Sequence, residues 1–205
     1  MNSRRAATDL KYCGKRITGM TKPTHYNRRL FIKSVIGTMV VGPAVLVSAC
    51  EDSNAVNRKL QFGSLRAALL EAERLVQVAS AETDSTWTLA QTLTHCAQSI
   101  EYSMTGFPQM KSALFQNTAG AAAFSLFAWR GRMSHDLAEP IPGAPSLHDK
   151  TDPGVALARL RKSVDDFATA QEPLQPHFAF GQLSKTDYER AHSMHLANHF
   201  SVIDA

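Results

Sequence analysis

One uninterrupted stretch, residues 184–203, places the strongest limit on what this chain can fold into. Its twenty residues contain neither Gly nor Pro, the two residues that most often interrupt a helix. Ser184 can cap the start of a helix, and Asp187 three residues later can act as its partner in a capping box. The sequence therefore predicts a single helix over this stretch.

Three of the eight histidines in the chain lie in this predicted helix. His192, His195 and His199 fall within about 60° of one another on one helical face, which Tyr188 and Ile203 share. Burying imidazoles is costly unless their nitrogens find partners, and neutral imidazole is the commonest protein ligand for a metal ion. The pair His195 and His199, four residues apart, can share one ion. The pattern also fits hydrogen-bonded core histidines, and a metal site would need a third ligand from elsewhere.

Apolar stripes and capping signals predict helices in the rest of the chain. No segment shows the apolar and polar alternation of a strand, so the expected fold class is all-α. Proline-rich sequence predicts a crossing loop at 139–145, and 176–181 reads as a short aromatic loop before the last helix. The predicted helices cover 64–78, 87–104, an inserted segment at 109–135 interrupted near Gly120 and Gly131, and 152–169.

Charge separates the first fifty residues from the rest. Residues 1–50 hold nine of the 22 Lys and Arg and one of the 18 Asp and Glu. The remaining 13 basic and 17 acidic residues give residues 51–205 a net charge of −4. A body without a basic excess gives no reason to expect nucleic acid binding. We expect a leader at 1–50, a polar tether at 51–60 and one helical domain at 61–205.

The leader resembles a twin-arginine export signal that ends in a lipobox. Arg28 and Arg29 precede Leu-Phe-Ile-Lys, and a short apolar stretch follows at 34–49. The sequence Val-Ser-Ala before Cys50 resembles a lipobox, in which Cys50 would be lipidated and become the mature N-terminus. A plain signal peptide or an uncleaved anchor would also fit this stretch. Met20 would give the signal an ordinary length if translation starts there.

These features predict export to the periplasmic side of a membrane. A lipid on Cys50 would anchor the protein there, and a soluble periplasmic protein is the alternative. Cys96 is the one thiol of the expected domain, so the sequence predicts no disulfide framework.

A third histidine lies in the predicted helix at 87–104. Periodicity places His95 about 120° from the apolar stripe of that helix, which predicts an exposed side chain. The motifs Trp-Thr at 87–88, Leu-Thr-His at 93–95 and His-x-x-x-His at 195–199 nevertheless resemble the DinB-like superfamily of metalloenzymes. The loops at 140–145 and 177–184 are similar to one bacterial branch known as a domain of unknown function.

The resemblance implies an up-and-down four-helix bundle with a metal site of three histidines. Carried over to this chain, the ligands are His95, His195 and His199. The branch often has a further histidine where this chain has Asn198, and a more polar ending at 201–203. The implied cofactor is a divalent transition metal, with zinc favoured over nickel or iron because three histidines and one open position are typical of catalytic zinc.

The implied function is metal-dependent hydrolysis or thiol-dependent transfer on a small molecule, with the substrate left open. The alternative is a non-catalytic binding or structural lipoprotein built on the same bundle, and a homodimer fits either reading. His177 can contact substrate or pack against its phenylalanine neighbours, and His192 is expected in the core or behind the ligands. His135 and His148 are interpreted as loop histidines.

Overall fold

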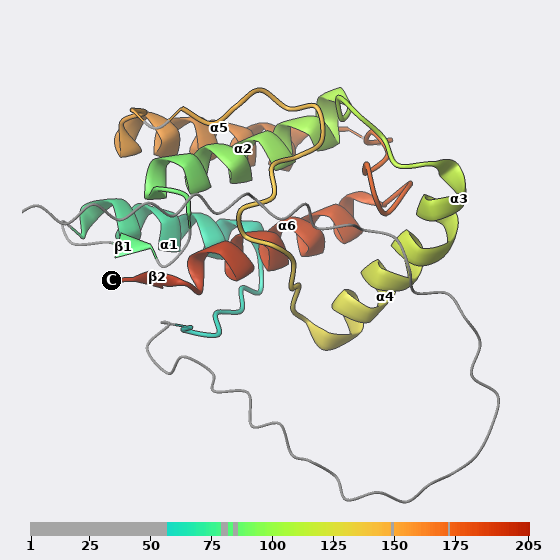
Figure 1. The fold of residues 1–205 in the computed structure, drawn as a ribbon, viewed down its shortest axis with the longest axis horizontal. Helices are drawn as coiled ribbons and strands as arrows, with labels where there is room; N and C mark the ends of the chain where they lie inside the picture. The colour runs from blue at the N-terminus through green and yellow to red at the C-terminus, as the bar shows by residue number, and fades with distance from the viewer. Residues whose placement is uncertain (1–56, 79–81, 84–85, 149, 172) are drawn as a thin grey trace, which may run out of the picture. The chain divides into compact units, whose positions relative to one another are not determined.

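Helices make up most of the chain between residues 57 and 205. The computed structural model describes residues 57–78, 82–83, 86–148, 150–171 and 173–205. Its mainly helical content confirms the all-α prediction (Figure 1). The elements are α1 (Leu65–Gln77), β1 (Glu82–Thr83), α2 (Leu89–Thr105), α3 (Ala113–Phe115), the π-helix η1 (Gln116–Gly120), α4 (Ala121–Arg130), α5 (Pro153–Thr169), α6 (Lys185–Phe200) and β2 (Ile203–Asp204).

Side-chain caps fix where the four long helices begin. The hydroxyls of Ser64 and Ser184 accept backbone N–H groups in the first turns of α1 and α6. Thr88 and Gln91 form a complete capping box at the start of α2. The Asp152 carboxylate accepts two backbone N–H groups at the start of α5, whose first residue is proline. Helix α2 begins at Leu89, two residues after the predicted start at 87.

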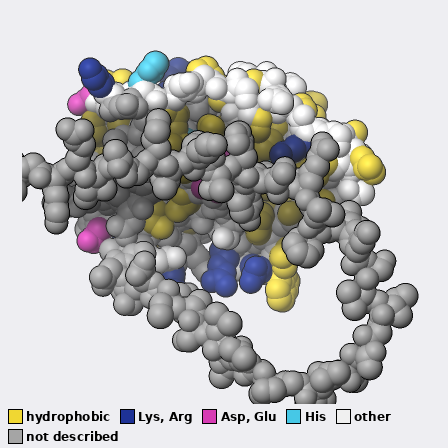
Figure 2. Space-filling model, viewed as in Figure 1, with side chains coloured by type: hydrophobic (Ala, Val, Ile, Leu, Met, Phe, Trp, Pro, Cys, Tyr) yellow, Lys and Arg dark blue, Asp and Glu magenta, His cyan; other side chains and the backbone are white. Residues whose placement is uncertain are grey.

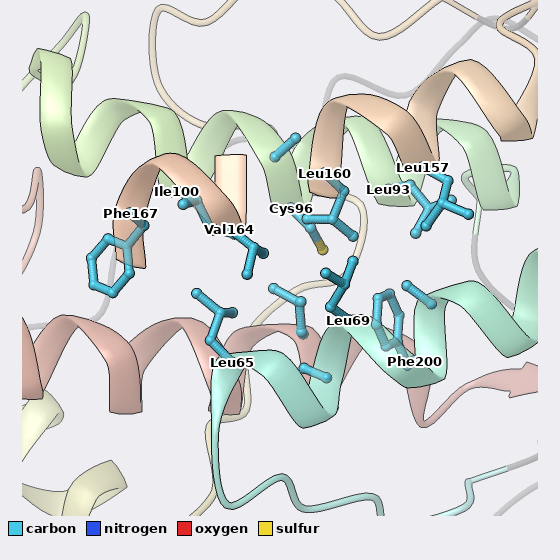
Figure 3. Close-up of a cluster of buried hydrophobic side chains, with 14 of the residues drawn as sticks. Leu65, Leu69, Leu93, Cys96, Ile100, Leu157, Leu160, Val164, Phe167 and Phe200 are labelled. Carbon is cyan, nitrogen blue, oxygen red and sulfur yellow. The ribbon is translucent and has the colours of Figure 1, made fainter. Parts of the chain in front are cut away.

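The core lies between α1, α2, α5 and α6. Figure 3 shows side chains from these four helices pointing toward one another. Each fully buried Leu or Ile contributes about 1.5–3 kcal/mol relative to exposure, so this cluster is the main source of stability. Its members include Leu65, Leu69, Leu93, Cys96, Ile100, Leu157, Leu160, Val164, Phe167 and Phe200.

The segment α3–η1–α4 forms one further helical run outside this core. The inserted helix predicted at 109–135 is confirmed between residues 113 and 130. Gly131, with a φ of +67°, follows the last residue of α4 in the left-handed conformation. No residue of α4 is buried, and Trp129 is 83 % exposed. Figure 2 shows hydrophobic and Lys or Arg side chains together at the end of α4.

The end of α6 differs from the prediction. The helix ends at Phe200, and Ile203 instead pairs in antiparallel fashion with Thr83 in a two-residue ladder. The sequence gives no alternating pattern here because a two-residue strand is too short to show one. Ser201 ends the helix by donating its hydroxyl hydrogen to the Ala197 carbonyl oxygen at 2.7 Å and accepting the Leu60 N–H at 2.9 Å.

Within the described ranges, none of the helices has the length and apolar content needed to cross a membrane. The expected export signal with Arg28 and Arg29, the lipidation site Cys50 and the alternative start Met20 lie outside the described residues.

Candidate metal centre

Three histidine nitrogens converge between α2 and α6. The Nε2 atom of His195 lies 3.2 Å from Nε2 of His95 and 3.1 Å from Nε2 of His199. One ring nitrogen from each of the three lies within 4.8 Å of the others. All three side chains are 9 % exposed or less. The structure thus brings together the three residues that the family resemblance implies.

His95 is buried, which corrects the periodicity argument. Its exposure is 3 %, although it lies away from the apolar stripe of α2. Two contacts explain this: α6 packs against α2, and the crossing loop covers the same face. Gln91 and Gln98 of α2 donate side-chain N–H groups to the carbonyl oxygens of Leu147 and Pro145, each at 3.4 Å. A helix in contact with elements on two sides buries polar residues that its apolar stripe does not include.

Ring packing orients the cluster. The Trp87 ring lies 4.8 Å from the His95 ring and stacks on His199 at 5.9 Å, with an interplanar angle of 13°. Among the described residues, the buried Nδ1 atom of His95 has no hydrogen-bond partner, so packing rather than a second hydrogen bond holds this ring. Trp87 therefore fixes one imidazole from each of the two helices.

The three imidazoles are neutral at physiological pH. Burial, with a smaller contribution from the nearby His135, lowers the pKa of His95 from 6.5 to about 3. Burial also holds the pKa of His195 and of His199 well below 6.5, with smaller contributions from the other imidazoles of the cluster. Neutral imidazole is the form that donates a lone pair to a metal ion.

His135 lies beside the cluster, which the sequence did not indicate. Its ring is 5.1 Å from the rings of both His195 and His199. It belongs to the connection between α4 and α5, which runs past α6 toward α2 (Figure 1). The sequence predicts only a loop histidine here, because nothing in the local sequence places that loop against α6. The other histidine interpreted as a loop residue, His148, lies outside the helices and is exposed.

His177 is held in one tautomer by the loop before α6. Its Nδ1 accepts the backbone N–H groups of Ala179 and Phe180 at 3.1 and 3.2 Å, so the hydrogen of the neutral ring is on Nε2. The ring stacks on Phe180 at 4.3 Å with an interplanar angle of 8°. Burial lowers its pKa to about 3, and His192 adds to the shift. His177 is therefore both packed against phenylalanine and available as a neutral donor.

His192 belongs to the core, as expected. Its ring lies 5.4 Å from Tyr188 in a stacked arrangement and 5.3 Å from Phe167. Burial lowers its pKa to about 3. It is not among the three residues whose ring nitrogens converge.

A cavity of about 250 Å³ opens beside the histidines. Five histidines line it: His95, His135, His177, His192 and His195. Aromatic and aliphatic side chains supply most of the rest, and Lys111 and Glu139 are its charged lining residues. The apolar part of the wall is Phe127, Met133, Pro140, Ile141, Pro142, Phe178, Ala179, Phe180 and Ala191.

Comparison with known proteins identifies the family. A family model described as "Protein of unknown function (DUF1569)" matches residues 54–204. The chain belongs to this family. No curated protein and no solved structure matches the chain. The DUF1569 match covers α1 to α6 and therefore all three converging histidines.

The donor set of this DUF1569 protein fits a transition-metal ion. Bonds of about 2.0–2.1 Å at a tetrahedral angle place two imidazole nitrogens about 3.3 Å apart. The His95–His195 and His195–His199 separations of 3.2 and 3.1 Å agree with that value, and all three ligand atoms lie within 4.8 Å of one another. Three ring nitrogens that can hydrogen-bond only to one another cannot all act as acceptors, because each hydrogen bond needs one of them to carry a hydrogen. A shared ion would instead accept the lone pair of each nitrogen.

The single described cysteine of the DUF1569 domain is not part of the site. Cys96 follows His95 in α2 but points into the core, where it is fully buried. Burial raises the pKa of its thiol, so this side chain stays protonated. Among the described residues, no thiol is available to the converging histidines.

Proposed function

We propose that this DUF1569 protein is an exported metal-binding protein that acts on a small molecule. Its helices would form the up-and-down four-helix bundle of DinB-like proteins, with His95, His195 and His199 as ligands of one divalent transition ion. The observation that carries the proposal is the convergence of three buried ring nitrogens beside a cavity. Zinc is the favoured ion, with nickel or iron as alternatives.

The ion would supply Lewis acidity, polarising a substrate oxygen or lowering the pKa of a substrate thiol. The chain itself provides the side chains around the ion. The three neutral imidazoles leave the ion most of its positive charge, and Trp87 holds two of them in place. The Nε2–H of His177 can donate a hydrogen bond to a substrate in the cavity.

The lining of the cavity indicates the kind of substrate. Phe127, Met133 and Phe180 suit an apolar group, and Lys111 and Glu139 suit polar groups at its edge. We propose hydrolysis or thiol-dependent transfer as the reaction. Thiol transfer fits a site in which the described chain has no thiol of its own to offer.

The cellular setting is part of the proposal. Twin-arginine export through Arg28 and Arg29 and a lipid on Cys50 would place the domain on the periplasmic side of a membrane.

The metal site is tested by elemental analysis of protein that has been purified without chelator.

The cobalt(II) form separates an enzyme from a binding module. A thiolate bound to cobalt adds a sulfur-to-metal charge-transfer band. If small thiols produce this band, the ion has an exchangeable position as thiol transfer requires. A spectrum that neither thiols nor other small molecules alter favours a non-catalytic binding module.

A further inference from the structure

His135 lies at the same distance from the cluster as its members lie from one another. The ring centroids of His95, His195 and His199 are separated by 4.8–5.0 Å. The His135 ring is 5.1 Å from those of His195 and His199. A fourth imidazole thus lies against two of the three ligands and comes from a different part of the chain.

The tautomer of His135 is fixed by its own backbone. Its Nδ1 lies 2.8 Å from the carbonyl oxygen of Asp136. A carbonyl oxygen can only accept, so Nδ1 carries the hydrogen and the lone pair of the neutral ring is on Nε2. Histidines that bind metals usually show this pattern, in which the other ring nitrogen donates to a backbone carbonyl or a carboxylate. The Asp136 carboxylate accepts the Ala138 N–H at 2.9 Å, which holds the turn.

The Nε2 lone pair of His135 has no partner among the described residues. This atom is buried and makes no hydrogen bond within the described chain. A buried acceptor without a hydrogen bond costs about 1–3 kcal/mol. His135 also lines the cavity beside His95 and His195, so its ring faces the region where the ligands converge. An ion at that place would satisfy this lone pair as well.

We propose that His135 is a fourth nitrogen ligand of the ion, supplied by the connection between α4 and α5. The inference rests on the metal site proposed above, and with His135 bound the exchangeable position for a small molecule would be a fifth one. The ligand atoms that lie within 4.8 Å of one another belong to the other three histidines, so binding draws the His135 segment inward. Met133, Glu139 and Ile141 line the cavity from this same connection, so metal binding would also set the shape of the cavity.

Metal affinity tests the proposal. The wild-type chain and three variants, His95→Ala, His135→Ala and His148→Ala, are titrated with zinc against a chromophoric chelator. We expect His135→Ala to weaken binding by more than the about 10–100-fold that loss of an outer-shell partner costs. His95→Ala should remove most of the binding, and exposed His148→Ala should match wild type. A His135→Ala affinity equal to that of His148→Ala would overturn the proposal.

Two further readouts separate a ligand from a packing residue. The cobalt(II) absorption spectrum should change in His135→Ala and in His135→Gln, because a nitrogen donor is lost. Trypsin cleavage after Arg132, three residues before His135, should slow when metal is added to wild type and not to His135→Ala. An unchanged cobalt spectrum, or equal metal protection in both proteins, contradicts the proposal.

The same titrations distinguish the absence of a fourth ligand from the absence of the whole metal site. If wild type binds no zinc or cobalt, the proposed metal site is wrong. If wild type binds metal, His95→Ala does not, and His135→Ala behaves as wild type, the site stands with three histidines and the fourth ligand is rejected.

Discussion

The Nε2 atoms of His95 and His195 lie 3.2 Å apart, although one hundred positions separate them in the chain. This contact joins α2 to α6 at a place where both helices present polar side chains. An ion held there would tie the two helices together and would bind the folded chain alone. Stability and metal binding are therefore coupled.

Removal of the metal should lower the melting temperature. An ion present at about a thousand times its dissociation constant adds about 4 kcal/mol to the free energy of unfolding. For a domain of this size that corresponds to a shift on the order of 10 °C. Calorimetry of the wild-type chain before and after chelation measures it. His95→Ala serves as the control and should melt at the same temperature with and without chelator, and a chelator-sensitive His95→Ala would contradict this reading.

Acid should destabilise the metal-free protein through its buried histidines. The pKa of His192 is about 3 in the folded chain and 6.5 when unperturbed, so between these values the unfolded chain binds a proton that the folded chain does not. The free energy of unfolding therefore falls as the pH falls from 6.5 toward 3, by about 1.4 kcal/mol per pH unit for each such histidine.

Replacing one of these histidines isolates its contribution to the pH dependence of stability. In chelator, His192→Leu should reduce the slope of stability against pH by about 1.4 kcal/mol per unit below pH 6. It should cost little at pH 7, because the buried Nε2 atom of His192 has no hydrogen-bond partner in the part of the chain that the structure describes. Urea denaturation at several pH values measures both quantities. An unchanged slope would show that His192 already binds a proton in the folded protein.

The loop that carries His177 depends on Gly120. A Cβ atom at Gly120 would lie 1.9 Å from the Ala179 carbonyl oxygen, which leaves no room for any larger residue. Gly120→Ala should therefore push the loop away from η1 and cost about 1–3 kcal/mol. Gly63→Ala is the matched control, since a Cβ atom there has nothing within 4 Å. Equal denaturation midpoints for the two variants would contradict the close packing of this loop.

The proposed export is tested by substitutions in residues 1–50. Replacing Arg28 and Arg29 by Lys should retain the protein in the cytoplasm, because the twin-arginine route reads that pair. Cys50→Ala should release the domain from the membrane fraction. Cell fractionation measures both outcomes. Normal export of the Lys variant would indicate another route, and membrane retention of Cys50→Ala would indicate an uncleaved anchor.

Local signals predicted the helices well where the chain carries its own caps. The boundaries of α5 follow from Asp152 and Pro153 at the start and from the prolines that follow the helix. The end of α6 could not be predicted in this way. Ile203 continues the helical pattern in sequence, but pairing with Thr83, far away in the chain, draws it into a strand.

The site was predictable only in part. His195 and His199 follow from helical spacing, whereas burial of His95 depends on the crossing loop that covers the second face of α2. Family resemblance supplied this residue where periodicity failed. Neither helical spacing nor family resemblance indicated His135, because its position against α6 is set by the course of the connection after α4. Such long-range placement is not encoded in local pattern.

The metal content of protein purified without chelator tests the central claim most directly. We predict about one transition-metal ion per wild-type chain, close to none in His95→Ala, His195→Ala or His199→Ala, and near the wild-type value in His192→Ala. Wild-type protein without metal would contradict the account. So would a His192→Ala variant that loses its metal while His95→Ala keeps it, because the site would then be built around α6 alone.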